Sequence, residues 1–243
     1  MKRLLMILSC VVVLSVAMRP DAVRASIVVY QNTLGDNFHG PFPPGTLEVG
    51  DEVILAGVGS QTLTEFSFLY QATVPLNANA TVTVAFYPND GGLVSGHALP
   101  GSAFWTSPAF GIIDTEGAYT KVSYNTTDFG TLGTLVVPHQ FTWSVKFAYD
   151  SGVSVVLADI CPPTIGQNFS TYWQNDGSGW TLNQSSTIDP GTGLPMPVSF
   201  GATFTAVPEP SAIWVPTFSA LIVIIARRIS RRRRGPVTVL DAN

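Results

Sequence analysis

Apolar and polar side chains alternate along much of the central part of this chain. Between Phe141 and Tyr149, aromatic and aliphatic residues take every second position, with Thr, Ser, Lys and Ala between them. The segments Thr62–Tyr70 and Thr81–Phe86 repeat the pattern. Successive side chains of a β-strand point to opposite faces of a sheet, so each segment predicts a strand with one apolar face. Trp143 falls on the inward face of its strand and is predicted to lie in the core.

Turn residues separate these segments from further short strands. Clusters such as Asp150–Gly152 and Asn175–Gly179 are rich in the residues that favour tight turns. No segment of residues 26–206 shows the apolar stripe of a helix, and the spacing of the strands predicts an all-β fold, an antiparallel β-sandwich of jelly-roll type. The irregular stretch Gly91–Glu116 carries many apolar side chains and is predicted to fold over a sheet. The further predicted strands are Ile27–Asn32, Glu52–Val58, Ala118–Tyr124, Leu132–Val137, Val153–Ala158, Ser170–Gln174, Gly179–Asn183 and Val198–Ala206.

Residues 1–25 predict a secretory signal peptide with a signal helix. Two basic residues precede the apolar stretch Leu4–Met18, and small residues suit a cut after Ala25. A lipoprotein signal at Cys10 would come too early, inside the apolar stretch, whereas an uncleaved N-terminal anchor stays open as an alternative. Once the leader is removed, Cys161 is the single cysteine and has no intramolecular disulfide partner.

An uncharged apolar segment, Ile213–Ala226, predicts a C-terminal transmembrane helix. As a helix it would span roughly 21 Å, against about 30 Å for the hydrocarbon core of a bilayer. Flanking arginines that snorkel to the head groups narrow this difference. By the positive-inside rule the arginines belong on the cytoplasmic side, which places the residues before Val207 outside. The residues of this stop-transfer signal are Arg227, Arg228, Arg231, Arg232, Arg233 and Arg234.

Residues 207–234 as a whole resemble a known sorting signal. Val207, Pro208, Glu209, Pro210 and Ser211 are followed by the apolar segment and then by the arginine cluster, an order similar to that of the PEP-CTERM signal of exopolysaccharide-producing Gram-negative bacteria. The resemblance implies that a membrane-embedded exosortase recognises the Pro-Glu-Pro element, cuts near it and discards the tail. The short tail 235–243 departs from the family, which usually ends at the arginines. An ordinary single-pass anchor is the alternative.

Charge is distributed unevenly along the chain. Ten of the twelve basic residues lie outside Ser26–Glu209, where two lysines stand against fourteen acidic residues and the formal charge is −12, compared with −4 for the whole chain. Such an acidic body repels nucleic acid and anionic surfaces, so no nucleic-acid partner is expected. The predicted location is the inner membrane transiently, and then the cell surface or the extracellular matrix.

The body of the chain, residues 26–206, also resembles loosely the uncharacterised choice-of-anchor domains found ahead of such sorting tails. The likeness depends on Thr81–Gly92, a strand followed by an acidic Gly-rich turn, and on the Trp173–Trp180 hairpin. It implies a fold and no mechanism. No catalytic residue is predicted, because no G-x-S-x-G occurs and the acidic pairs Asp114/Glu116 and Asp51/Glu52 lack a catalytic context.

Calcium is the one metal for which the chain offers candidates, and they are weak. Asp36, Asp90 and Asp176 each stand beside an Asn in a turn, and calcium prefers carboxylate and carbonyl oxygens. The same Asn and Asp residues are what a tight turn needs, which is the simpler interpretation. No other metal and no cofactor are expected, since the three histidines lie far apart.

Tyr172, Trp173 and Trp180 flank one Gly-rich turn and are candidates for stacking on a glycan. Their alternative role is core packing or a cross-strand pair. We therefore expect an exported, exosortase-processed surface or extracellular-matrix protein without catalytic activity. A carbohydrate-binding module, with or without calcium, is the alternative, and a secreted glycan hydrolase is the third hypothesis. The expected partners are the exosortase, the membrane through the C-terminal helix, and extracellular polysaccharide.

Overall fold

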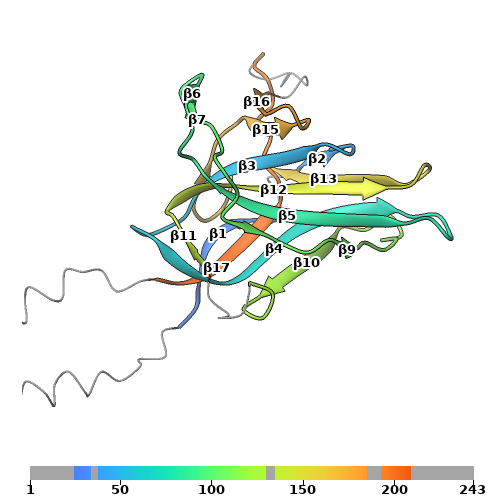
Figure 1. The fold of residues 1–243 in the computed structure, drawn as a ribbon, viewed down its shortest axis with the longest axis horizontal. Helices are drawn as coiled ribbons and strands as arrows, with labels where there is room; N and C mark the ends of the chain where they lie inside the picture. Colours follow the sequence, from blue (N-terminus) through green and yellow to red (C-terminus); the bar gives the residue numbers. More distant parts are fainter. Residues whose placement is uncertain (1–24, 34–37, 130–134, 185–192, 209–243) are drawn as a thin grey trace, which may run out of the picture. The chain divides into compact units, whose positions relative to one another are not determined.

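The computed structural model describes residues 25–33, 38–129, 135–184 and 193–208, and the elements of these residues are all β-strands (Figure 1). The predicted all-β class with antiparallel pairing is thereby confirmed. The signal helix, the C-terminal helix with its arginines, and the candidate Asp36 lie outside the described residues. Within those residues, no helix has the length and apolar character that a membrane crossing requires.

Sheet A is built around the long strand β4. Every pairing in it is antiparallel, and β17 and β13 follow one another along one side of β4 while β10 and β11 occupy the other side. The strands of this sheet are β1 (Ile27–Asn32), β17 (Ala202–Pro208), β4 (Gln61–Thr73), β13 (Ser154–Ile160), β2 (Phe38–Phe42), β10 (Thr120–Asn125) and β11 (Leu135–Val137).

Sheet B has β12 at its centre, between β3 and β5, and β6 and β7 form a separate small hairpin. The two short strands β14 and β9 pair with β3 and β5 respectively. The strands are β16 (Trp180–Asn183), β15 (Tyr172–Asn175), β3 (Glu48–Ile54), β12 (Gln140–Tyr149), β5 (Ala80–Pro88), β8 (Trp105–Thr106), β14 (Gln167–Asn168) and β9 (Phe110–Gly111), with β6 (Leu93–Val94) and β7 (His97–Ala98) in the hairpin.

Aromatic side chains from the two sheets meet in one core. The ring centroid of Phe66 on β4 lies 5.2 Å from those of Phe86 and Trp143 and 4.7 Å from that of Phe204. Phe66 therefore contacts side chains of β5, β12 and β17. Trp143 is fully buried, as its place in the alternating pattern predicts. Removing these faces from water is the main source of stability for such a sandwich, at about 1.5–3 kcal/mol per large side chain.

The strand boundaries differ from the predicted ones where glycine or long-range pairing decides them. β3 begins at Glu48, which pairs with Lys146 and Asn175, and it ends at Ile54, ahead of the turn in which Gly57 and Gly59 have positive φ. β2 was not predicted, since its sequence contains Gly and Pro and its regularity depends on pairing with β13. The stretch Gly91–Glu116 extends the edge of sheet B, because β8 and β9 pair with β5, and Trp105 and Phe110 pack against the core.

The first and last described strands lie side by side. Ile27 of β1 is opposite Ala206 of β17, and β17 continues through Val207 and Pro208, which pair with Thr62 and Gln61 of β4. Val207 and Pro208, the first two residues of the predicted sorting motif, are therefore part of the sheet, whereas Glu209, Pro210 and Ser211 lie outside the described residues.

Candidate functional site

The outer face of sheet B collects polar side chains, and β3 explains why. Val49, Asp51 and Val53 point inward and are buried. Glu48 and Glu52 alternate with them and point outward, onto the same face as the polar residues of β12. The adjacent pair Asp51/Glu52 consequently points to opposite faces of the sheet, so these two carboxylates do not face each other across a cleft as glycosidase chemistry requires.

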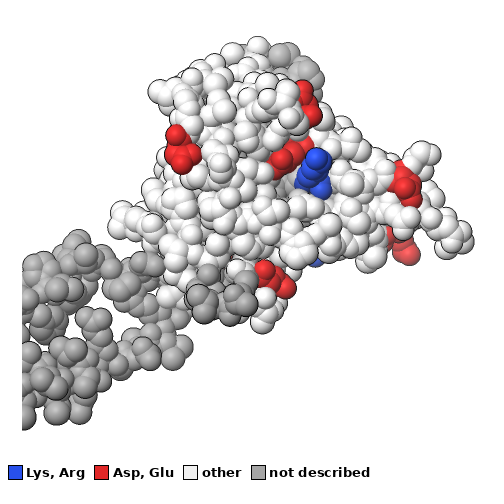
Figure 2. All heavy atoms as spheres, in the orientation of Figure 1, with Lys and Arg blue, Asp and Glu red and all other residues white. Residues whose placement is uncertain are grey.

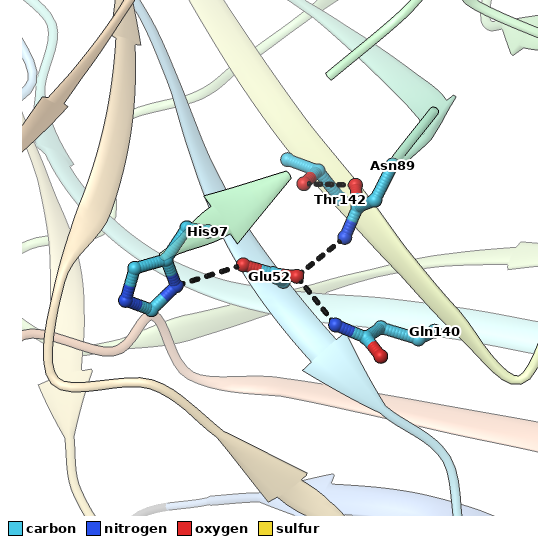
Figure 3. A network of polar contacts seen from close by, with 5 residues as sticks. All are labelled: Glu52, Asn89, His97, Gln140 and Thr142. Atoms are coloured by element: carbon cyan, nitrogen blue, oxygen red, sulfur yellow. Dashed lines mark hydrogen bonds and ion pairs between the residues drawn. The ribbon is translucent and has the colours of Figure 1, made fainter. Parts of the chain in front are cut away.

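Glu52 is the centre of a closed polar cluster (Figure 3). Its Oε1 accepts hydrogen bonds from Asn89 Nδ2 at 2.7 Å and from Gln140 Nε2 at 2.6 Å, and its Oε2 lies 3.2 Å from His97 Nδ1. Thr142 donates to Asn89 Oδ1 at 2.8 Å. The Glu52 side chain is only 3% exposed. His97 belongs to β7, Gln140 to β12, and Asn89 follows β5, so this carboxylate links the β6–β7 hairpin to sheet B. Both of its oxygens are occupied and the side chain is buried, so a ligand cannot reach it.

Glu48 organises a second cluster, which is more open. Its Oε1 accepts from Tyr87 Oη and from Ser144 Oγ, both at 2.6 Å, and its Oε2 accepts from Asn175 Nδ2 at 3.4 Å. Burial and then the hydrogen bond to Glu48 raise the pKa of Tyr87 well above its usual value, so this hydroxyl stays protonated as a donor. The rings of Tyr87 and Trp180 form a T-shaped pair, with centroids 5.1 Å apart.

The Glu48 cluster thus presents a partly exposed tryptophan beside fixed acid and amide groups. Tyr87, Asn175 and Trp180 are all of intermediate exposure, and Lys146, opposite Glu48 in the register, is exposed. Figure 2 shows acidic side chains spread over the visible face with few basic ones. An indole face next to hydrogen-bonding groups suits the apolar face and the hydroxyl groups of a sugar.

The structure separates the three predicted glycan-stacking residues. Trp173 is 1% exposed and lies opposite Gly50 of β3, so the prediction that it offers a face to a sugar is wrong and its alternative role in packing is correct. Tyr172 is partly buried against Phe42 and Phe200. Trp180 alone of the three combines partial exposure with a polar surround. It pairs with Asn175, whereas Trp173 pairs with Leu182, so the two indoles are not directly opposed.

The described calcium candidates are not brought together. Asp176 is fully exposed, and its Oδ1 accepts from Ser178 N at 2.9 Å and from Ser178 Oγ at 2.6 Å, which lowers the pKa of the carboxyl and closes a tight turn. Asp90 is also exposed, and it lies in a different loop, the one that follows β5. Across the described ranges, no three His, Cys, Asp or Glu side chains are arranged to hold a metal ion.

Asp114 and Cys161, the other candidate reactive residues, lie in surroundings that do not favour catalysis. Asp114 accepts from Val74 N at 2.9 Å and from Glu116 N at 2.7 Å, and these backbone donors lower the pKa of its carboxyl. Cys161 is half-buried, and burial, aided by the charges of Asp51 and Asp159, raises the pKa of its thiol to about 11. At neutral pH the thiol is therefore protonated and a poor nucleophile.

The residues missed by sequence reasoning are Glu48, Tyr87 and Asn175. A strand begun at Glu48 would have placed Glu48 and Glu52 on one face, so the signal was present in the alternation but hidden by Gly50.

Comparison with models of known protein families, with curated proteins and with solved structures finds no match for this chain.

Proposed function

We propose that this protein is an exported, non-catalytic surface or extracellular-matrix protein of a polysaccharide-producing Gram-negative bacterium. A signal peptide delivers it across the inner membrane, and an exosortase processes its PEP-CTERM-like tail. The two antiparallel sheets support a β-sandwich body, for which we propose the jelly-roll type. The acidic body and the basic, apolar ends of the sequence support the proposed topology.

The observation that supports this proposal is that the described strands end at Pro208, the first proline of the predicted Pro-Glu-Pro element. The last strand contains Val207 and Pro208, and all the described elements are complete at Pro208. Phe204 of the same strand is fully buried, so a cut upstream of it would remove a core strand. A cut at or after Pro208 leaves the sandwich whole, which is what release of a folded domain requires.

Replacing Pro208, Glu209 and Pro210 by alanine is expected to leave an unprocessed, membrane-bound chain. The recognition element is lost, while the apolar segment and its arginines still arrest the chain in the membrane. Cell fractionation and the electrophoretic mobility of the full chain measure this. The control replaces Pro43 and Pro44 by alanine, two prolines of the loop after β2. A host without its exosortase should accumulate the same unprocessed form, and equal release of the triple variant and the native chain would refute exosortase handling.

The Glu48 cluster favours a second candidate function, binding of extracellular polysaccharide. The Trp180→Ala variant is expected to lose retention on polysaccharide from the native host, because it removes the exposed apolar face while Glu48, Tyr87 and Asn175 keep their mutual bonds. Affinity chromatography of the full chain, in a detergent without a sugar head group, measures this. The control is Glu65→Gln, which alters an exposed ion pair with Lys121 on sheet A. If the Trp180→Ala variant is retained as strongly as the native chain, the outer face of sheet B is not the polysaccharide-binding site.

A further inference from the structure

The long strand β4 connects two ends of the domain that differ in character. It has thirteen residues and so extends about 40 Å. The β3–β4 turn precedes it and the β4–β5 turn follows it, and Figure 1 shows these two turns at opposite ends. Pro208, the last residue of β17, pairs with Gln61, the first residue of β4. The β3–β4 turn is therefore at the same end of the domain as Pro208, and we call this the Pro208 end.

The Pro208 end exposes aliphatic side chains from several elements. Val58 in the β3–β4 turn is 84% exposed. Val136 on β11 is about half exposed and lies opposite Thr62, the second residue of β4. Ile27, the first residue of β1, is also about half exposed and pairs with β17. Three elements thus bring exposed aliphatic side chains to the place where the chain continues toward its C-terminal tail.

Charge distinguishes the Pro208 end from the opposite end. The segments that surround Pro208 contain no Asp, Glu, Lys or Arg; they are residues 53–64, 135–140 and 202–208. At the opposite end, Asp114 accepts from Val74 N and Asp150 accepts from Asn79 N, on the two sides of the β4–β5 turn. Leu76 in that turn is 93% exposed, but it stands between these two carboxylates. An anionic lipid surface would repel the opposite end and tolerate the Pro208 end.

The sequence limits how far the Pro208 end can be from the membrane. Four residues separate Pro208 from Ile213, where the predicted transmembrane segment begins. Five peptide units span at most about 18 Å when fully extended. The head-group region occupies about 5–8 Å on each side of the hydrocarbon core, so about 10–13 Å remains. A chain arrested in the bilayer therefore holds the Pro208 end within reach of the lipid head groups.

We infer that, until the tail is cut, the Pro208 end rests on the lipid surface, with Val58 and Val136 among the head groups. This inference rests on the proposed function, because it needs the tail to be arrested in the bilayer. Exposed aliphatic side chains gain free energy when they leave water, and no charged residue of the surrounding segments has to be desolvated with them. The contact would hold the Pro-Glu-Pro element close to the membrane, where a membrane-embedded exosortase can reach it.

The test compares two labelled positions in the unprocessed chain, purified from a host without its exosortase. Val58→Cys and Leu76→Cys are made in a Cys161→Ser background and labelled with NBD, a fluorophore whose emission shifts to shorter wavelength away from water. The chain is reconstituted into vesicles of phosphatidylethanolamine and phosphatidylglycerol. Leu76 is the matched control, because it too is an exposed aliphatic residue of a turn but lies at the opposite end. We expect the shift, and quenching by nitroxide-labelled lipids, at position 58 and not at position 76.

Flotation of the vesicles separates this inference from the proposed function. If the chain does not float with the vesicles, the tail does not arrest it, and the proposed function and the inference are both wrong. If the chain floats but the label at position 58 emits like the label at position 76, the lipid contact is overturned and membrane arrest stands.

A charge at position 58 tests the same contact in the native host. Val58→Asp is expected to slow release of the processed protein about threefold to tenfold, the order for losing the burial of one aliphatic side chain, whereas Leu76→Asp should not change it. Slow release of Val58→Asp, combined with a label at position 58 that stays in water, would indicate a contact with the exosortase and would overturn the contact with lipid.

Discussion

The Trp143→Ala variant is expected to lose about 3–5 kcal/mol of unfolding free energy, the range for a large buried aromatic residue. Trp143 is fully buried. Its ring centroid lies 5.2 Å from that of Phe66, 6.1 Å from that of Phe68 and 6.2 Å from that of Phe200. These neighbours come from the opposite sheet or the loop that leads into it, so the cavity would open at the contact between the two sheets. Since domains are typically stable by about 5–15 kcal/mol, the loss threatens folding itself.

Chemical unfolding of the full chain, followed by circular dichroism, measures this difference. Trp143→Phe is the matched control, because it retains an aromatic ring, leaves a smaller cavity than alanine, and removes an indole N–H that has no hydrogen-bond partner within the described residues. It should cost much less than the alanine variant. If both variants unfold at the denaturant concentration of the native chain, Trp143 does not hold the sheets together.

The Asp51→Asn variant is expected to be more stable than the native chain at neutral pH, by about 2–4 kcal/mol, because the folded chain must either keep a proton on this buried carboxyl or bury its charge. Asp51 is fully buried on the inward face of β3. Its Oδ2 accepts from Ser199 Oγ at 2.8 Å and from Phe200 N at 3.2 Å, whereas its Oδ1 has no partner among the described groups. Burial raises the pKa of this carboxyl well above its usual value, the two hydrogen bonds oppose that shift, and the charges of Asp159 and Glu52 reinforce it.

The direction of the pH dependence follows from this raised pKa. At pH values between the ordinary carboxyl pKa of the unfolded chain and the higher pKa of the folded chain, the folded state holds a proton that the unfolded state has released. The contribution of Asp51 to stability is therefore complete at acid pH and is lost as the pH rises through the folded-state pKa. Asparagine carries no such proton, so the advantage of the variant should grow with pH.

Thermal unfolding of the native chain, Asp51→Asn and Asp51→Ala across the acid-to-neutral range distinguishes the cause. An asparagine retains an acceptor for the hydrogen bonds from Ser199 and Phe200. Alanine removes the acceptor as well as the charge and is expected to destabilise the fold at acid pH. An Asp51→Asn variant less stable than the native chain at neutral pH would show that the ionised carboxylate is required.

The strands with the strongest alternation were predictable because their pattern is local. β12, β5 and the centre of β4 are amphipathic over at least five residues, and each lies where the prediction placed it. β2 was not predictable from its own residues, since Gly40 and Pro41 disfavour a strand and the pairing with β13 compensates. The short strands β8 and β9 likewise depend on the free edge of β5.

The candidate sites depend more strongly on the fold. The glycan hypothesis drew attention to Trp173 and Trp180 through their proximity to one turn, yet the register puts Trp173 against Gly50, where it is buried, and Trp180 beside Tyr87. The partners of Glu48 come from positions 87, 144 and 175, and those of Glu52 from 89, 97 and 140. No spacing in the sequence relates such residues, because strand order in an antiparallel sandwich is set by pairing over long distances along the chain.

The sequence by itself determined the β class, the inward position of Trp143 and the acidic character of the body, because alternation and composition act over a few neighbouring residues. The tertiary structure alone decided which carboxylate is enclosed, which tryptophan meets solvent, and that Val207 and Pro208 belong to the sheet. These features depend on the register between β3, β12 and β15 and between β17 and β4. A shift of one residue in any of these pairings would turn each side chain to the other face.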